Sequence, residues 1–239
     1  MKLFINTGGE GKRLYPVTRG IPKPLVVIAG KTVLHHLIDW AKKSGFEEIV
    51  FMNGFGADKI MSHFKDGSHL GVKIGHSNEP YPLGSGGPVK YAKRFIDGRF
   101  AYISGDLVCD VDFKKMLDFH VSRGADMTVH VHPSTHPNDS DILQTDDNGK
   151  VIKFISKHAD HTGAGILSNS GLCILEPETL DIMDREVFNF ENYFYPKMLE
   201  ANKNLFAYNT DEFIYDTGTF ERLHICEKYL ETKNFLESS

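Results

Sequence analysis

The sequence has few cysteines and no long hydrophobic run, and each absence excludes a class of protein. The 3 cysteines, Cys109, Cys173 and Cys226, lie far apart and form no C-x-x-C pair. Neither a disulfide framework nor a structural zinc site is therefore indicated. No apolar run approaches the roughly 18 residues that cross a bilayer, and the start reaches Gly8 and Gly9 too early for a signal peptide. We expect a cytoplasmic protein without a leader and without membrane binding.

The chain also lacks an excess of positive charge. It has 27 Lys and Arg against 32 Asp and Glu, for a net charge of -5. No global basic field exists that could hold a nucleic acid, so we expect no nucleic-acid partner. Any phosphate that the protein binds must be held by a local group of cations.

The remaining composition is that of an ordinary globular protein. With 239 residues, 41% hydrophobic and 25% charged, the chain is long enough for one large α/β domain or one domain with a lid, at about 150 residues per domain. We find no internal repeat, no Pro- or Ser-rich linker and no charge block. The sequence therefore favours one domain with one sheet and one cleft.

Short apolar runs alternate with segments of helical periodicity, mainly in the first half of the chain. The predicted strands are 3–6, 49–53, 72–76, 100–104 and 127–132, and the predicted helices are 32–44, 57–64, 88–95, 113–123 and 220–230. From residue 126 onward, strand-like pieces are separated by turn signals, and Asp146-Asp147-Asn148-Gly149 predicts a hairpin. We predict a Rossmann-like three-layer α/β/α fold with a mixed, mostly parallel sheet and a small antiparallel insertion.

A glycine-rich loop follows the first predicted strand and contains Gly8, Gly9 and Gly11, then Lys12 and Arg13. Glycines allow close approach of the backbone to a ligand, and their N–H groups can surround an anion. The spacing fits neither a Walker loop nor the dinucleotide fingerprint, so a dinucleotide-dependent oxidoreductase is set aside.

Two cations accompany this loop. Arg13 can contact phosphate oxygens in a bidentate manner, and Lys23 is a point charge on a backbone stiffened by Pro22 and Pro24. Either could be an ordinary surface charge if it stood alone. Together with the glycines they indicate a polyphosphate substrate.

The run Gly8-Gly9-Glu10-Gly11-Lys12-Arg13-Leu14, followed by Pro22-Lys23-Pro24, resembles the signature of the sugar-1-phosphate nucleotidyltransferases. The resemblance implies that residues 1–125 form the nucleotide-binding half and 126–239 the sugar-phosphate-binding half with the C-terminal helix. It also implies catalytic roles for Arg13, Lys23, Asp106 and Asp216. The family usually has Thr or Ser where this chain has Lys12, so donor contacts there are expected to differ.

A second glycine-rich loop precedes the predicted helix 88–95. By resemblance, Leu83, Gly84 and Ser85 surround the nucleobase, and we expect free N–H groups at the helix start to favour a polar or anionic ligand. A simple loop before a helix is the alternative. Glu79, just upstream, either accepts hydrogen bonds from a guanine edge or faces water.

Asp106 follows the predicted strand 100–104, at the edge where open α/β sheets bind ligands. Mg²⁺ is typically held by one or two carboxylates and substrate phosphates, and resemblance to the family's late Asp-x-Gly-Thr motif makes Asp216 the second metal ligand. Phe220 stands where that motif commonly has proline. Asp110 and Asp112 are rival ligands, although we favour a helix-capping role for Asp112.

The resemblance places the acceptor in the second half of the chain. It implies that Lys157, Asn169 and Gly171 bind the sugar phosphate and its hydroxyls, while Ser156 replaces the family's glutamate. We also interpret Tyr193-Phe194-Tyr195 as an exposed aromatic run compatible with a homodimer surface.

A histidine-rich segment runs from His130 to Asp141. Strand alternation would put His130 and His132 on one face, which is the minimum for a metal pair, but no cysteine partner accompanies them. The segment resembles the branch that acts on D-glycero-alpha-D-manno-heptose 1-phosphate with GTP and makes GDP-heptose for bacterial surface glycans such as lipopolysaccharide and capsule. Thymidylyl-, cytidylyl-, uridylyl- or mannose-1-phosphate guanylyl transfer, or a noncatalytic regulatory subunit that binds nucleotide sugars, remain as alternatives.

Overall fold

One continuous mixed sheet organises the computed structural model, which describes residues 1–9, 11, 14–15, 18, 20–134, 141–159 and 165–237. Its parallel core consists of neighbouring strands in the order β6, β1, β4 and β5. These are β6 (Phe100–Ser104), β1 (Lys2–Asn6), β4 (Glu48–Asn53) and β5 (Lys73–Asn78). The predicted strands 3–6, 49–53, 72–76 and 100–104 therefore form and pair as parallel neighbours.

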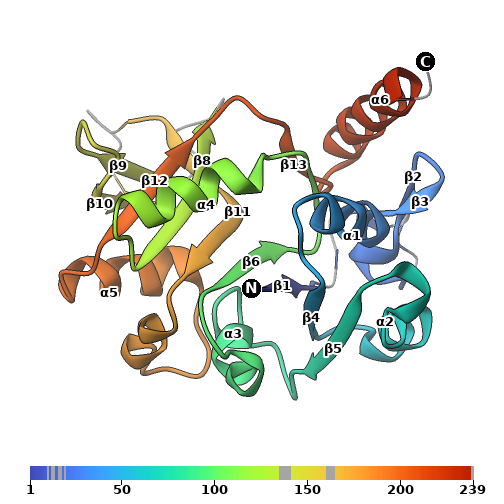
Figure 1. Cartoon of the computed structure of the whole chain (residues 1–239), viewed down its shortest axis with the longest axis horizontal. Helices are drawn as coiled ribbons and strands as arrows, with labels where there is room; N and C mark the ends of the chain where they lie inside the picture. Colours follow the sequence, from blue (N-terminus) through green and yellow to red (C-terminus); the bar gives the residue numbers. More distant parts are fainter. Residues whose placement is uncertain are drawn as a thin grey trace.

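The second half of the chain extends the same sheet. Strand β11 (Leu167–Leu175) pairs antiparallel with β6, and it also pairs with β8 (Met127–Pro133) and β9 (Ile142–Thr145). Strand β12 (Leu205–Asn209) runs parallel to β8, and β10 (Val151–Ile155) completes a hairpin with β9. The predicted mixed α/β fold is confirmed, and the sheet passes through both predicted halves (Figure 1).

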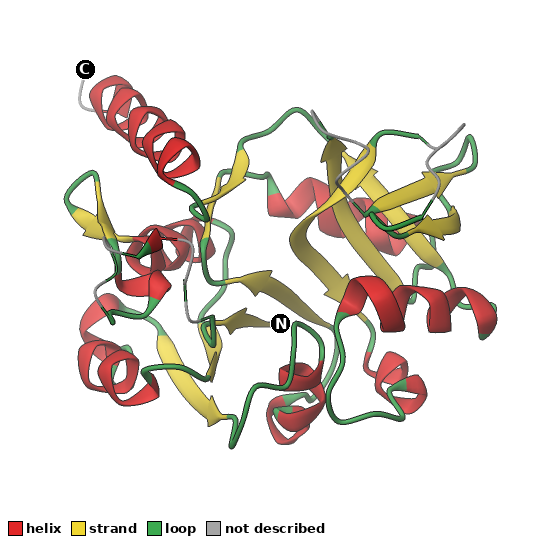
Figure 2. Cartoon of the chain, turned by 180° about the vertical axis from the view of Figure 1, so that it is seen from behind, coloured by secondary structure: helices red, strands yellow, loops and turns green. Residues whose placement is uncertain are grey.

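Helices cover both faces of the sheet (Figure 2). Successive residues of β1 face opposite cores: Leu3 and Ile5 pack with α1 (Val33–Lys43), whereas Phe4 packs on the other face with α3 (Gly87–Tyr91) and α5 (Tyr195–Glu200). Helices α2 (Ala57–Phe64) and α4 (Phe113–Ser122) join α1 in the first core. Burial on both faces explains why the parallel strands have continuous apolar runs.

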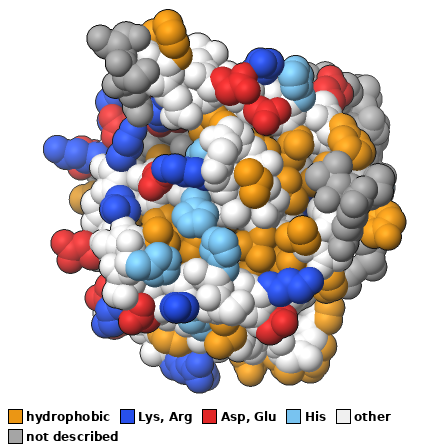
Figure 3. Space-filling model, turned by 90° about the vertical axis from the view of Figure 1, so that its right-hand side faces the viewer, with side chains coloured by type: hydrophobic (Ala, Val, Ile, Leu, Met, Phe, Trp, Pro, Cys, Tyr) orange, Lys and Arg blue, Asp and Glu red, His pale blue; other side chains and the backbone are white. Residues whose placement is uncertain are grey.

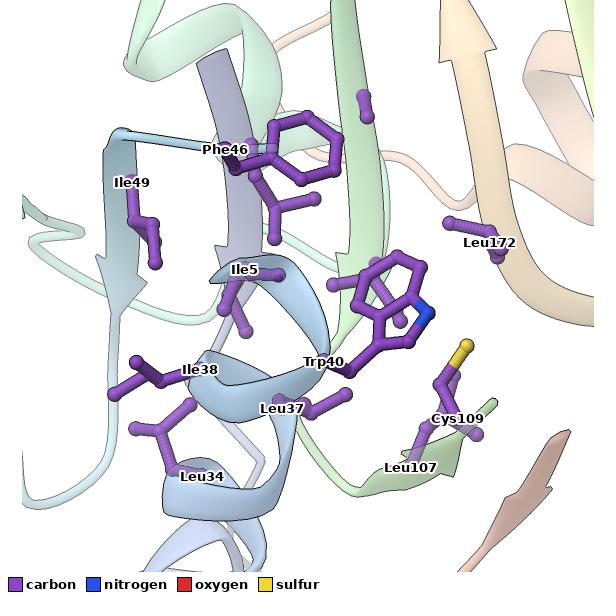
Figure 4. Packing of buried hydrophobic residues seen from close by; sticks show 14 of the residues in the cluster. Ile5, Leu34, Leu37, Ile38, Trp40, Phe46, Ile49, Leu107, Cys109 and Leu172 are labelled. Atoms are coloured by element: carbon purple, nitrogen blue, oxygen red, sulfur yellow. The ribbon is translucent and has the colours of Figure 1, made fainter. Parts of the chain in front are cut away.

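Helix α1 forms as its sequence predicts. The side chain of Thr32 caps its start by accepting a hydrogen bond from the backbone N–H of His35 at 3.2 Å. The apolar face of α1 lies over the strands, and Trp40 lies beside Cys109 (Figure 4). The indole N–H donates to the carbonyl of Val111 at 2.9 Å, which satisfies its polar atom in the core.

The C-terminal helix α6 (Phe220–Glu237) projects from the body at the end of the chain (Figure 1). Cys226 and Leu230 bury its inner side in a small third cluster with β2 (Val27–Ile28), while β3 (Lys31–Thr32) pairs with β2. The helix is longer than the predicted 220–230. Tyr229 and Lys233 both donate to Asp110, so this rival metal ligand holds the helix.

Two local predictions in the remaining elements are confirmed. In the predicted hairpin, the N–H of Asp146 donates to the carbonyl of Lys150 at 2.9 Å, and Gly149 has φ 83°. Asp112 caps α4 by accepting from the N–H of Lys115 at 3.2 Å. Asp112 is therefore occupied by helix capping, as favoured from the sequence.

The predicted exposed aromatic run is wrong. Tyr193, Phe194 and Tyr195 are buried against the second core. They belong to the π-helix Phe190–Phe194 and the start of α5, which turn these side chains inward. The argument for a homodimer surface at this segment is therefore lost.

Within the described residues, no helix is long and apolar enough to cross a membrane.

Candidate active site

The parallel strands end at one edge of the sheet, which we call the carboxyl edge and define by Asn6, Asn53, Asn78 and Ser104. Asn53 connects neighbouring strands there. Its side-chain oxygen Oδ1 accepts from the hydroxyl of Thr7 at 2.8 Å, and its side-chain amide nitrogen donates to Oδ1 of Asn78 at 2.9 Å. The loops after these strands therefore start from fixed positions.

The first glycine loop packs against other loops of the carboxyl edge. A Cβ on Gly8 would lie 2.8 Å from Oε1 of Glu79 and 3.3 Å from the nitrogen of Gly54. Gly9 has open space around it, and Gly11, with φ 64°, lies against the side chain of Lys23. Lys12 and Arg13 lie outside the described residues, so their predicted contacts stay predictions.

Lys23 is brought to the carboxyl edge by a short 3-10 helix, Lys23–Leu25. It is only 6% exposed, and its ammonium pairs with Oδ2 of Asp106. Lysine is seldom buried without a partner because desolvation of the charge is costly. The structure thus joins the predicted loop cation to the predicted metal ligand, which lies 83 residues further along the chain.

Asp106 and Asp216 come together through a two-stranded ladder. Strand β7 (Leu107–Cys109) pairs antiparallel with β13 (Ile214–Asp216), with Asp216 opposite Leu107. The N–H of Thr217 donates to the backbone carbonyl of Asp106 at 2.8 Å. Both carboxylates remain about one-third exposed, at 31% and 32%.

This pair fits a hard divalent cation that also binds substrate phosphates. Carboxylate oxygens are ligands that Mg²⁺ prefers, and few protein ligands are needed when phosphates supply the others. The described residues contain no group of three or more His, Cys, Asp or Glu arranged to hold a metal. Asp106 and Asp216 would hold such an ion.

Glu79 lies beneath the first glycine loop. Burial raises the pKa of its carboxyl, while a hydrogen bond from the N–H of Leu83 to Oε2, at 3.1 Å, acts in the opposite direction. Oε1 faces Gly8 and Gly54. The carboxylate therefore positions the second glycine loop.

The glycines of the second loop accommodate another segment of the same chain. Gly84 has φ 85°, and a Cβ there would collide with the Phe188 carbonyl oxygen. The N–H groups of Gly86 and Gly87 donate to that carbonyl at 3.0 and 3.2 Å, and the N–H of Ser85 donates to Asn189 at 2.9 Å. The expectation of free N–H groups at the start of this helix is therefore wrong.

A polar cavity of about 660 Å³ opens beside the β7–β13 ladder. Polar side chains from distant parts of the chain line it. They include His132, Asp141, Ser156, Lys157, His158, Asn169, Ser170, Asn189, Glu191, Asn192, Asp216 and Arg222. The structure thus brings the predicted Lys157 and Asn169 to one cavity with Asp216.

Asn169 and Gly171 have complementary structural roles on β11. The N–H of Gly171 donates to Oδ1 of Asn169 at 2.9 Å, and Gly171 has φ 90° at a register shift between Asn169 and Cys173. A glycine permits this bulge because it adopts positive φ without strain. The bulge leaves the Asn169 amide to donate to Glu191 at 3.0 Å. Gly171 shapes the strand and does not line the cavity.

Sequence reasoning missed Glu191 and Arg222. Glu191 accepts from Asn169 through Oε1 and from the hydroxyl of Ser85 through Oε2, at 3.0 and 3.2 Å. It lies in a π-helix, a rare element that is frequent at functional sites. Arg222 in α6 pairs with Asp216 at 2.7 Å. The position of Arg222 six residues after Asp216 was the one available signal.

His130 and His132 do not share a site. His130 is fully buried, and its ring nitrogens lie 2.9 Å from the Ser170 hydroxyl and 3.1 Å from the Thr210 hydroxyl. Burial, with a smaller contribution from His132, lowers the pKa of His130 to about 4. His130 is therefore a neutral structural residue at pH 7, whereas His132 lines the polar cavity.

Histidine side chains also gather on another surface (Figure 3). His35 of α1 and His63 of α2 are in edge contact, with ring centroids 5.1 Å apart. No metal-binding group of three occurs in the part of the chain that the structure describes.

Comparisons with known proteins identify the family of this chain. The family model described as "Nucleotidyl transferase" matches residues 3–233. The chain is 32% identical over 223 residues to a mannose-1-phosphate guanylyltransferase catalytic subunit beta of Dictyostelium discoideum, covering 91% of this chain and 61% of the relative. It is 30% identical over 226 residues to a UTP–glucose-1-phosphate uridylyltransferase of Synechocystis, covering 88% and 58%.

Among solved structures, HddC from Yersinia pseudotuberculosis complexed with GMP-PN superposes with a TM-score of 0.81. The two chains are 26% identical, and the match covers 96% of this chain and 99% of HddC. This chain spans about three-fifths of the length of the curated relatives described above.

Proposed function

Because the chain belongs to the nucleotidyl transferase family, we propose that it transfers a nucleotidyl group from an NTP to a sugar 1-phosphate and releases pyrophosphate. The observation that carries the proposal is the convergence of Lys23, Asp106 and Asp216 beside a polar cavity of about 660 Å³. The carboxyl edge holds the nucleotide, and the polar cavity holds the sugar 1-phosphate.

The reaction is an in-line attack by a phosphate oxygen of the sugar 1-phosphate on the α-phosphorus of the NTP. The new P–O bond forms as the bond to pyrophosphate breaks. The nucleophile is already an anion, so positioning and charge neutralisation supply the catalysis and no general base is needed. Lys23 binds the triphosphate, and Lys157 holds the incoming phosphate.

Asp106 and Asp216 hold Mg²⁺ in this proposal, and the ion when bound neutralises phosphate charge. Lys23 has two partners in turn: Asp106 in the free protein, and a phosphate oxygen when nucleotide is present. The buried position of Lys23 strengthens its interaction with phosphate because little water screens it. Arg13 supplies a further cation to the triphosphate.

GTP and D-glycero-alpha-D-manno-heptose 1-phosphate are the proposed substrates. The likeness to HddC, which was solved with GMP-PN, supports a guanine donor. The heptose assignment is supported by the sequence segment 132–141. His132 and Asp141, the two ends of this segment, line the polar cavity. A cytoplasmic location, where NTPs are available, is part of the same proposal.

A substrate matrix tests the proposed function. Pyrophosphate release is measured with GTP, CTP, UTP, dTTP and ATP, each against heptose, mannose and glucose 1-phosphates. We expect the highest kcat/KM with GTP and the heptose substrate, and no turnover when EDTA removes Mg²⁺. A preference for UTP or dTTP with glucose 1-phosphate overturns the substrate assignment. Nucleotide-sugar binding without pyrophosphate release from any pair identifies a noncatalytic binding protein instead.

A further inference from the structure

Arg222 occupies a position between the carboxyl edge and the polar cavity. It lies in the first turn of α6, where its N–H donates to the Thr219 hydroxyl at 3.2 Å and the N–H of Leu223 donates to the Thr219 carbonyl at 2.9 Å. These bonds fix the backbone. The Arg222 side chain is 44% exposed and lines the polar cavity, so its guanidinium can change partner without movement of the helix.

Asp216 has both carboxylate oxygens occupied in this structure. Oδ1 accepts from the N–H of Gly218 at 2.8 Å, and Oδ2 accepts from a terminal nitrogen of Arg222 at 2.7 Å. The bond to Gly218 is part of the local turn. Arg222 therefore occupies Oδ2, the oxygen of Asp216 that would otherwise be available to a cation.

A guanidinium and a divalent cation compete for that oxygen because like charges at short distance repel each other. The same arrangement occurs at Asp106, whose Oδ2 is taken by Lys23. Each of the two carboxylates thus carries one cationic side chain of the protein. Arg222 differs from Lys23 in being on the side of the polar cavity.

A phosphate ligand in the polar cavity would give Arg222 a second partner. Asp141 and Glu191 are the other carboxylates among its lining residues, and both accept hydrogen bonds from within the chain: Asp141 from the N–H of Lys157 at 2.8 Å, and Glu191 from Asn169 and Ser85. Arg222 and Lys157 both line this cavity, so a phosphate that binds there would have both cations among its neighbours. The planar guanidinium suits bidentate contact with phosphate oxygens.

We propose that Arg222 exchanges partners during the reaction cycle: it holds Asp216 before the divalent cation is bound, and afterwards binds the 1-phosphate group of the acceptor together with Lys157. This inference rests on the proposed function for its second half. The exchange couples metal binding to acceptor binding, because the same guanidinium serves both sites.

Two measurements on Arg222→Gln test the exchange, with Lys228→Gln as the matched control. Lys228 lies on the same helix and pairs with Glu231 at its surface. The first measurement is Mn²⁺ binding to the free protein by electron paramagnetic resonance, without nucleotide or sugar. We expect Arg222→Gln to lower the Kd for Mn²⁺ by about fivefold or more, and Lys228→Gln to leave it unchanged.

The second measurement is the KM for the sugar 1-phosphate that is most active in the substrate matrix. Arg222→Gln should raise this KM by about tenfold or more, the range for a lost charge-assisted hydrogen bond, and change the KM for the NTP by less than about twofold. Arg222→Lys should give an intermediate acceptor KM because it keeps the charge and loses the bidentate geometry.

The outcomes separate this inference from the proposed function. An active wild-type enzyme whose Arg222→Gln variant keeps both the Mn²⁺ affinity and the acceptor KM of the wild type overturns the exchange alone. If the wild type releases pyrophosphate from no substrate pair, the proposed function fails and the acceptor half of the exchange fails with it. The Mn²⁺ titration then still decides whether Arg222 competes for Asp216, and a lack of tighter binding overturns that half as well.

Discussion

The carboxyl edge and the polar cavity are built in opposite ways. At the carboxyl edge, the loops follow directly after parallel strands. Glu79 occupies the space beside Gly8, and Phe188 occupies the space beside Gly84. The polar cavity keeps about 660 Å³ open and takes its lining from segments between Leu107 and Arg222. Under the proposed function, the closely packed edge holds the triphosphate that all NTPs share, and the open polar cavity holds the sugar, whose recognition can change by exchange of side chains.

The largest effect is expected where the two regions meet. Asp106→Asn should lower kcat for pyrophosphate release by about 10³-fold, because an electrostatic group at the reacting phosphates is lost. Circular dichroism should remain that of the folded wild type. Asp118→Asn, exposed on α4, is the matched control and should keep normal turnover. Near-normal turnover of Asp106→Asn would remove this carboxylate from the metal role.

The close packing of the carboxyl edge predicts a stability effect. Gly84→Ala should lower the free energy of unfolding by about 2 to 3 kcal/mol, since alanine is strained at φ 85° and its Cβ meets the Phe188 carbonyl. Urea denaturation measures this change. Gly98→Ala is the control, because nothing lies within 4 Å of a Cβ there. Equal stability of the two variants would contradict the description of this loop as closely packed.

The buried His130, whose ring contacts the cavity-lining Ser170, predicts a pH dependence of stability. Its folded pKa of about 4 lies below the ordinary value of 6.5, so the unfolded chain binds the proton more readily. The stabilisation is complete above pH 6.5 and is lost as the pH falls toward 4. Between pH 7 and pH 5, this group should remove about 2 kcal/mol from the free energy of unfolding.

The measurement for His130 is urea denaturation at both pH values for the wild type, His130→Gln and His224→Gln. The buried His120 and the half-buried His36 contribute in the same direction, so the informative quantity is the difference between proteins. His130→Gln should lose about 2 kcal/mol less than the wild type over this range. His224 is exposed on α6, and its variant should follow the wild type. An identical pH slope in all proteins would contradict the assignment.

The smallest effect is expected for the side chain that joins the two regions. Glu191→Ala should raise the KM for the sugar 1-phosphate by about fivefold and the KM for the NTP by about twofold, since it frees both Asn169 and Ser85. Glu200→Ala, exposed on α5, should change neither. Double-mutant cycles with Ser85→Ala should give a coupling of about 1 kcal/mol. Strictly additive effects would separate the two regions.

Features that depend on neighbours along the chain were predictable. The strands of the parallel core, the capping of α1 by Thr32 and the hairpin at Asp146 to Gly149 follow from local pattern. Family resemblance implied that Asp106 and Asp216 act as a pair of metal ligands. The β7–β13 ladder, which brings the two residues close together, could not be predicted from the sequence. The burial of the aromatic run was mispredicted because a π-helix has no clear sequence period.

The sequence by itself determined the class of fold and identified the first glycine loop and Lys23 as candidates for phosphate binding, because glycines, prolines and apolar alternation act within a few residues. Tertiary structure alone decided which side chains meet across long separations. It paired Lys23 with Asp106, Asp216 with Arg222, and Glu191 with both Ser85 and Asn169. It also packed residues 186–189 against the second glycine loop. Such contacts depend on the order and register of strands, which no local pattern specifies.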